Sequence, residues 1–393
     1  MRGRLEHIDA LRGFALFGIL LLHAHGKFGV GFTPPDGLIE LSRLDNIASE
    51  LVSFFVRNKA FAVFSIMFGF SFFLQMDRSS KKGIEFNLFY ARRLFLLLII
   101  GYVNAMVFLS DILTKYAIMG FILLFLYRLN QRLILILALL LLLQIPEWLQ
   151  TFQSMRDINY QLISYRNYEL WNKIAEINAT GSFLQVIEMN MWQGLIELWK
   201  LNITSGRLTN ILGYFLLGFL LGKSRLLEDI NKYRRVWIYM LIFAVHLYLL
   251  LRYARSVLPY NGDLTEVTIS LLQSIVTEYM NFFMVVIIMS LFVLLYQISV
   301  FKYLLNILRP YGRMSLTSYI FQSFLGVFLF YGFGIGLYNI LGSFLSLVVG
   351  VFILLFLLLF SNIWFRYFRF GPVEYVWRAM TYRTWGVGMR KEK

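Results

Sequence analysis

The chain contains no cysteine, few prolines and few charged residues. Among its 393 residues are 6 prolines, and charged residues make up 15%, against roughly 25% in a soluble domain. Without cysteine there is no disulfide, no thiolate nucleophile and no cysteine-bound metal site. No proline-rich, serine-rich or polar low-complexity stretch occurs, which excludes disordered and fibrous classes. Because 59% of the residues are hydrophobic, the apolar surplus must face lipid, and a water-soluble globule is excluded.

The common catalytic motifs of soluble enzymes are also missing. The sequence has no Gly-x-Ser-x-Gly nucleophile elbow, no phosphate-binding Gly-rich loop followed by Lys-Ser/Thr, and no His-Glu-x-x-His. We therefore expect no metal site. Any chemistry has to come from ionisable residues inside the hydrophobic segments.

Long apolar runs separated by charged clusters make up most of the sequence. A bilayer core requires about 20 apolar residues in one helix. Runs near this length cover residues 10–32, 51–76, 88–109, 112–127, 133–149, 208–221, 236–251, 269–296, 316–337 and 341–365. They predict an all-α fold, in which residues 1–393 form a single polytopic domain of about ten transmembrane helices, with the lipid bilayer as its main partner.

The charge balance is strongly positive, with 37 Lys and Arg against 22 Asp and Glu. We expect no nucleic-acid partner, because positive charge on a multispan protein collects in its cytoplasmic loops. Most of the Lys and Arg fall inside when both termini are cytoplasmic. Residues 150–207, which are rich in tryptophan, then form an extracytoplasmic interfacial segment between the fifth and sixth helices. Residues 366–393 form a basic cytoplasmic tail that begins with an amphipathic surface helix at about 370–382.

The first apolar run carries the densest set of ionisable residues. A charge at membrane depth costs at least about 2.5 kcal/mol unless it is paired or hydrated. Asp9 and Arg12 stand at the start of the run, and His23 follows Arg12 by eleven residues, which places Arg12 and His23 on nearly the same helix face. A neutral buried imidazole can accept a proton from a hydroxyl group. The simpler alternative is a histidine that bonds a carbonyl and joins two helices.

Arginines and an acidic residue open two further runs. Arg92 and Arg93 begin the third helix, where they could clamp phosphates together with Arg12, or merely reach to lipid headgroups as positive anchors. Asp111 lies one helical turn from Lys115, an arrangement that could be no more than an ion pair.

Polar stripes interrupt the eighth and ninth runs. Glu278 and Asn281 form the first stripe, and Gln322 belongs to the second. Such stripes commonly form interhelical hydrogen bonds. In the alternative interpretation, Asp111, Glu278 and Gln322 bind a substrate.

Three segments resemble the signatures of the DUF418 (YeiB-like) membrane proteins. They are His7-Ile-Asp9-Ala-Leu-Arg12-Gly13-Phe14-Ala15, Gly312-Arg313-Met-Ser315-Leu-Thr317-Ser318-Tyr319, and Phe370-Gly371-Pro372-Val-Glu374-Tyr-Val-Trp377. The family is similar in turn to transmembrane acyltransferases of the acyltransferase-3 and heparan-glucosaminide N-acetyltransferase types. The acyltransferase-3 pattern of an arginine followed eleven residues later by a histidine falls on Arg12 and His23. Gln322 departs from that pattern, since acyltransferase-3 proteins often have histidine there.

The resemblance implies a bacterial cell-membrane enzyme that moves an acyl group, expected to be acetyl, from cytoplasmic acyl-CoA to a glycan or lipid acceptor. In this hypothesis Arg12, Arg92 and Arg93 bind the CoA phosphates, Asp9 orients Arg12, and His23 is the general base. Two alternatives stay open. One is a transporter or proton-coupled permease that uses buried ionisable groups, and the other is a non-catalytic membrane scaffold. The sequence also leaves open whether the chain acts as a homodimer.

Overall fold

The computed structural model describes residues 5–29, 37–81, 83, 85–157, 159–161, 167–260, 264–385 and 389. Within these residues the regular structure is helical, so the predicted all-α class is confirmed. The helices are α1 Glu6–His25, α2 Ser42–Phe55, α3 Ala60–Lys81, α4 Phe86–Val107, α5 Leu113–Leu126, α6 Gln131–Leu142, α7 Ile145–Arg156, α8 Tyr168–Thr180, α9 Phe183–Met189, α10 Leu195–Thr204, α11 Arg207–Ser224, α12 Arg234–Val257, α13 Glu266–Leu295, α14 Ser299–Asn306, α15 Arg309–Arg313, α16 Ser315–Phe330, α17 Ser343–Tyr367 and α18 Pro372–Tyr382.

Several of these helices are suited to a membrane. In the described ranges, six helical segments are long and apolar enough to cross one: α1, the α2–α3 segment, α4, α12, α13 and α17. The pair α6 and α7 adds a seventh if it counts as one span bent by 48°, and α5 and α16 are shorter apolar helices. Every predicted apolar run overlaps a helix, but the predicted number of about ten spans is not confirmed.

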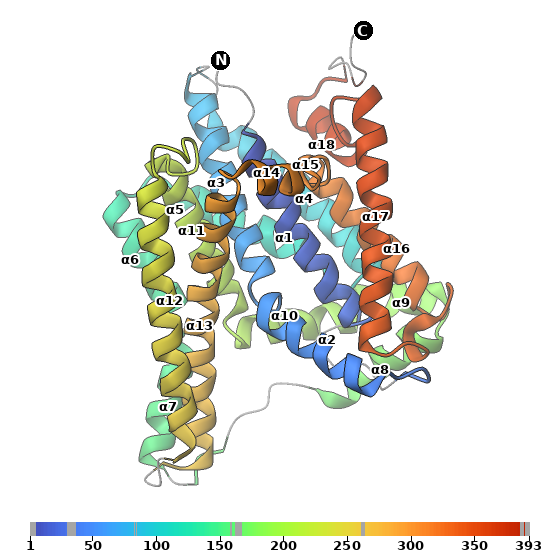
Figure 1. Ribbon diagram of the computed structural model, residues 1–393. Helices are drawn as coiled ribbons and strands as arrows, with labels where there is room; N and C mark the ends of the chain where they lie inside the picture. The colour runs from blue at the N-terminus through green and yellow to red at the C-terminus, as the bar shows by residue number, and fades with distance from the viewer. Residues whose placement is uncertain are drawn as a thin grey trace.

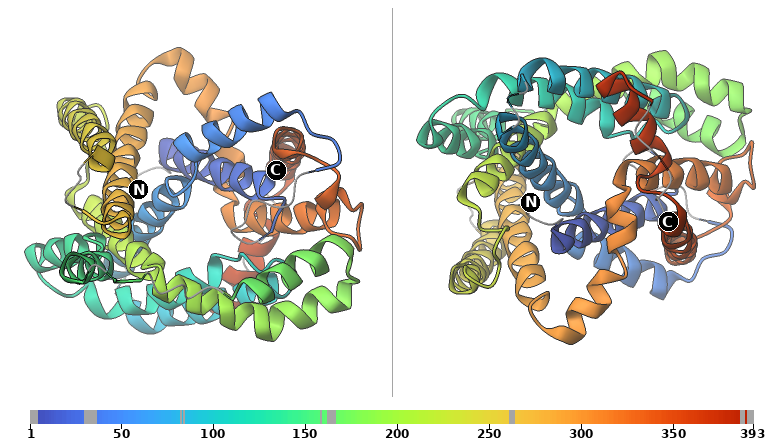
Figure 2. Two further views of the ribbon diagram at one scale, coloured as in Figure 1. Left: turned by 90° about the horizontal axis from the view of Figure 1, so that it is seen from below. Right: turned by 90° about the horizontal axis from the view of Figure 1, so that it is seen from above.

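The helices define two ends of the molecule (Figure 1). The start of α1 lies at the same end as α14, α15 and α18, and we call this the terminal end. The last turn of α1 lies at the other end, where α2, α8 and α10 are found, and we call this the opposite end. Helices α12 and α13 lie side by side along one flank of the molecule (Figure 2).

Close backbone contacts explain two of the sequence signatures. A side chain at Gly312 on α15 would place its Cβ 2.0 Å from the carbonyl oxygen of Asp9 on α1. A Cβ added at the facing Gly13 would likewise lie 2.3 Å from the carbonyl oxygen of Leu308. Only glycine permits these distances, so the first and second signatures are where α1 and α15 pack together.

The third signature fixes the start of α16. Glu374 on α18 accepts hydrogen bonds from the backbone N–H groups of Leu316, at 2.8 Å, and Thr317, at 3.2 Å, and from the Thr317 hydroxyl. A helix leaves its first N–H groups without helical partners, and a carboxylate there is also favoured by the helix dipole. On the other side of α18, Trp377 donates to the Arg93 carbonyl oxygen, at 2.9 Å. A helix, α18, therefore forms at the predicted C-terminal position and is tied to α4 and α16, but its predicted place on the membrane surface is not confirmed.

The segment predicted to be interfacial, residues 150–207, covers the end of α4. It contains α8, α9, α10 and a short π-helix, Asn190–Gly194, while residues 158 and 162–166 lie outside the described ranges. Asn190 donates to the carbonyl oxygen of Met106 at 3.0 Å. Trp171 belongs to a small apolar cluster that also includes Leu109, just after α4. The segment is therefore packed onto the helix bundle at the opposite end, where it contacts the residues that directly precede Asp111 in the chain.

Candidate functional site

His23 lies in the last turn of α1, among aromatic rings from three parts of the chain. Its ring centroid is 4.8 Å from that of Phe108, 5.8 Å from Phe28 and 6.3 Å from Tyr319. The Nδ1 atom is buried and has no hydrogen-bond partner among the described residues. His23 as a residue is partly exposed, although rings that follow α1 and α4, and one ring from α16, surround its imidazole. A histidine that joins two helices through a carbonyl does not fit this environment.

Two cations lie near the imidazole. Lys115 at the start of α5 is 4% exposed, and Arg207 is the first residue of α11. Both are close enough to act electrostatically on His23. The Arg207 guanidinium carbon lies 4.3 Å from the ring centroid of Phe61. No sequence pattern singles out Arg207, because it stands at the border of an interfacial segment and an apolar run.

Asp111 does not form the ion pair that its spacing from Lys115 suggested as one alternative. No nitrogen of Lys115 comes within 4.0 Å of a carboxylate oxygen in the part of the chain that the structure describes. Asp111 instead accepts hydrogen bonds from Asn104 Nδ2 and from the backbone N–H of Thr114, both at 2.9 Å. The carboxylate is thus held by the end of α4 and the start of α5, and it is 1% exposed.

Glu278 joins the same group of residues from α13. It accepts hydrogen bonds from Asn58 Nδ2, at 3.0 Å, and from Asn281 Nδ2, at 3.4 Å. Arg207 and Lys59 are the cations that act on it electrostatically. His23 thus lies near both Lys115 and Arg207, whereas Asp111 lies near Lys115 and Glu278 near Arg207. We call His23, Asp111, Lys115, Arg207 and Glu278 the polar cluster.

Tyr319 connects α16 to the polar cluster. Its hydroxyl oxygen accepts a hydrogen bond from the backbone N–H of Ile112 at 3.0 Å. Gln322 lies one turn further along α16, is fully buried, and accepts a hydrogen bond from the Tyr311 hydroxyl at 2.8 Å. Its contacts lie with α15, and the Gln322 Nε2 atom has no partner among the residues described. The structure thus gives Gln322 a helix-joining contact.

The arginines predicted to bind phosphates lie at the terminal end with partners of their own. Arg12 pairs with Asp9 at 3.2 Å, as expected, and donates to the Ser71 hydroxyl on α3 at 2.6 Å. The Arg93 guanidinium stacks on the Trp377 ring, 3.8 Å from its centroid. Arg92 is partly exposed. Arg12 and Arg93 are therefore each held by a different helix, α3 and α18.

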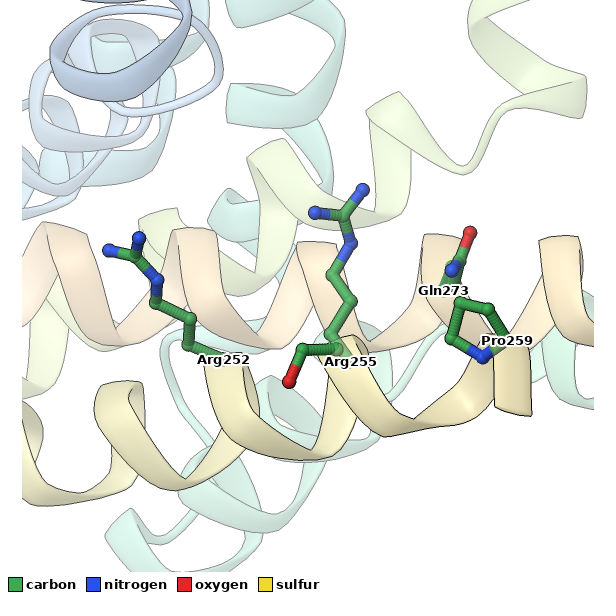
Figure 3. Close-up of a pocket in the computed structure, with 5 residues that line it drawn as sticks. Arg252, Arg255, Pro259 and Gln273 are labelled. Carbon is green, nitrogen blue, oxygen red and sulfur yellow. The ribbon is translucent and has the colours of Figure 1, made fainter. Parts of the chain in front are cut away.

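A separate pocket of about 310 Å³ opens beside α12 and α13. Figure 3 shows Arg252 and Arg255 projecting in the same direction from α12, with Pro259 and Gln273 further along. None of the residues of the polar cluster lines it. We do not assign it to the candidate site.

Comparisons with known proteins point to one family. The model of the DUF418 family, described as a protein of unknown function, matches residues 221–384. The uncharacterized protein YxaH of Bacillus subtilis (strain 168) is 30% identical and aligns with 99% of this chain and 97% of its own length. The uncharacterized protein YeiB of Escherichia coli (strain K12) is 27% identical, with 98% of both chains aligned. An uncharacterized 39.9 kDa protein of Bacillus acidopullulyticus is 26% identical over 99% of this chain and 97% of its own. No solved structure matches the chain.

Proposed function

The chain belongs to the DUF418 family, and we propose that it is an integral membrane acyltransferase with His23 as general base. The observation that carries this proposal is the His23 imidazole itself. His23 as a residue is partly exposed, the Nδ1 atom of its ring bonds no described residue, and Lys115 and Arg207 lie nearby. An imidazole without a structural partner remains able to take a proton from a substrate, as a general base must.

The reaction follows from this arrangement. A hydroxyl or amine of a glycan or lipid acceptor attacks the carbonyl carbon of acetyl-CoA while His23 takes the proton of the attacking group. The carbon–sulfur bond then breaks, and the CoA thiolate leaves and is protonated. Cations near the reacting carbonyl stabilise the negative charge that develops on its oxygen. Lys115 and Arg207 are the cations that surround His23.

We propose that the donor and the acceptor enter from different ends of the molecule. We propose that about ten helices span the cell membrane, that the terminal end is cytoplasmic, and that α18 lies on the inner surface. Acyl-CoA then enters beside Arg12, Arg92 and Arg93, which bind its phosphates, and the acceptor enters from the opposite end. Residues 150–207 would cover this second entry from the outer face.

The test is acyl transfer by the purified chain. Wild-type protein in detergent is incubated with radiolabelled acetyl-CoA and extracted membrane lipids or glycans. His23→Ala is expected to reduce transfer at least about 100-fold, the lower bound for losing a general base. His246→Ala is the matched control, because this exposed histidine only bonds the Ile242 carbonyl of its own helix. Transfer that survives in His23→Ala, or a wild-type chain that does not bind CoA, contradicts the proposal.

One observation favours a second candidate, a proton-coupled transporter. His23, Asp111 and Glu278 are three titratable groups from distant parts of the chain: His23 lies near Lys115 and Arg207, Asp111 near Lys115, and Glu278 near Arg207. Buried ionisable groups arranged in this way are typical of proton pathways in membranes. A pH gradient that drives uptake into proteoliposomes, and that needs Glu278, would favour transport over acyl transfer.

A further inference from the structure

Lys115 and Arg207 lie in the same part of the helix bundle, where their positive charges destabilise the fold. Their chain segments meet at Phe61: the Arg207 guanidinium carbon lies 4.3 Å from the centroid of the Phe61 ring, and the hydroxyl of Tyr116, the residue after Lys115, donates to the Phe61 carbonyl oxygen at 3.0 Å. Neither side chain forms an ion pair or hydrogen bond with any other described residue. A cation buried without a partner is strongly unfavourable, because the interior does not replace the water it loses.

The nearby carboxylates are bound elsewhere. Asp111 receives its hydrogen bonds from Asn104 and Thr114, and Glu278 receives those of Asn58 and Asn281. Each acid therefore has neutral donors at its oxygens. The two cations remain available to a negative group that is not part of this protein.

The chemistry of the pair favours one type of anion. A guanidinium offers parallel N–H donors that match two oxygens of one phosphate, and an ammonium adds a compact point charge. The Phe61 ring under Arg207 holds the flat guanidinium in one orientation, 4.3 Å from the ring centroid. Since Lys115 is 4% exposed, the phosphate would have to enter the bundle to reach it.

We infer that Lys115 and Arg207 form a binding site for a phosphate group carried by the acceptor. The inference rests on the proposed function only in taking the bound molecule to be the acyl acceptor, since phosphate binding itself needs no acyl donor. The substrate is then an anionic lipid or a phosphate-bearing glycan, and its phosphate anchors it beside His23. This site lies at the opposite end from Arg12 and Arg93, so it is distinct from any site for CoA phosphates.

The test is thermal unfolding of the delipidated full chain in neutral detergent, titrated at constant ionic strength. One arm uses inorganic phosphate, and the other uses short-chain phosphatidylglycerol. A ligand that binds only the folded state raises the midpoint in proportion to the logarithm of its excess over Kd. We expect saturable stabilisation of the wild type, and at least a tenfold weaker apparent affinity in Lys115→Met and Arg207→Gln.

Two further variants make the result specific. Arg252→Gln removes an exposed arginine outside the polar cluster and is expected to bind as the wild type does. Lys115→Arg keeps the positive charge and is expected to retain the affinity for phosphate within threefold. This variant tests the need for a cation even if Lys115→Met folds poorly. Equal responses in Lys115→Met and Lys115→Arg, or in Arg207→Gln and Arg252→Gln, overturn the inference.

The arms also identify the source of the phosphate. Tighter binding of the short-chain lipid than of inorganic phosphate supports a lipid acceptor, and equal binding supports a water-soluble phosphate on a glycan. Absence of stabilisation by both ligands overturns the site. A wild-type chain that transfers acetyl groups but is stabilised by neither ligand would overturn this inference and leave the proposed function intact.

Discussion

The two ends of α1 place cations in opposite situations. At the terminal end, Arg12 pairs with Asp9 and donates to Ser71. At the opposite end, Lys115 and Arg207 lie beside His23 without a hydrogen bond or ion pair to any described residue. The cation at the terminal end builds structure, whereas the pair at the opposite end costs stability. Proteins retain such costs where function requires them, so the difference directs attention to the opposite end.

The first way to test this comparison is to remove a cation from the structural end. Arg12→Gln is expected to lower the free energy of unfolding by about 2 kcal/mol, because the buried Asp9 carboxylate loses its ion pair with the Arg12 guanidinium. Unfolding in detergent, followed by circular dichroism, measures the change. In the Asp9→Asn/Arg12→Gln double variant the loss should be smaller than the sum of the two single losses. Additive losses would mean that the pair does not stabilise the fold.

The reverse result is expected at the opposite end. Lys115→Met keeps a long side chain and removes a buried ammonium that has no ion pair, so it should raise the free energy of unfolding by about 1 kcal/mol without ligand. The same measurement on Lys115→Arg should show no gain, because the charge remains. A loss of stability in Lys115→Met would show that Lys115 is a structural residue, and the contrast between the two ends would disappear.

Local patterns in the sequence predicted the fold class and some of the residues of the candidate site. The apolar runs located the helices because a run that buries its backbone hydrogen bonds in lipid has to be helical. The eleven-residue step from Arg12 to His23 is also local, since it lies within α1. The pairing of Asp9 with Arg12 followed from a three-residue spacing in the same helix.

The rest of the candidate site depends on packing between helices that are distant in the chain. The spacing of residues in the sequence does not indicate which of these helices pack together. Arg207 approaches His23 only because α11 packs on α3, where Gly69 and Gly218 allow close contact with the backbone of Phe215 and Ile66. The contact of Arg93 with Trp377 likewise joins residues far apart in the chain. In the sequence Arg93 could equally have been a membrane anchor, and nothing singled out Arg207, because an anchor and a bound cation differ only in their surroundings.

The smallest expected effect concerns a carboxyl group at the terminal end. Burial raises the pKa of Glu374 on α18 above its ordinary value, and the hydrogen bonds from Thr317 and Leu316 offset this only in part. Glu374 therefore binds a proton more tightly in the folded state than in the unfolded state. Its contribution to stability is therefore fully present below the ordinary glutamate pKa and is lost as the pH rises through the raised value.

Glu374→Gln should remove this pH dependence, with a change in unfolding free energy of about 1 kcal/mol or less, because the amide oxygen still accepts from the start of α16. The measurement is the unfolding midpoint of wild type and variant between acidic and neutral pH. Glu169→Gln, at an exposed position on α8, is the control and should follow the wild-type curve. If Glu374→Gln also follows that curve, the Glu374 proton does not contribute to stability. The terminal end would then depend on its hydrogen bonds, and on the pairing of Arg12 with Asp9, rather than on the protonation of this carboxyl group.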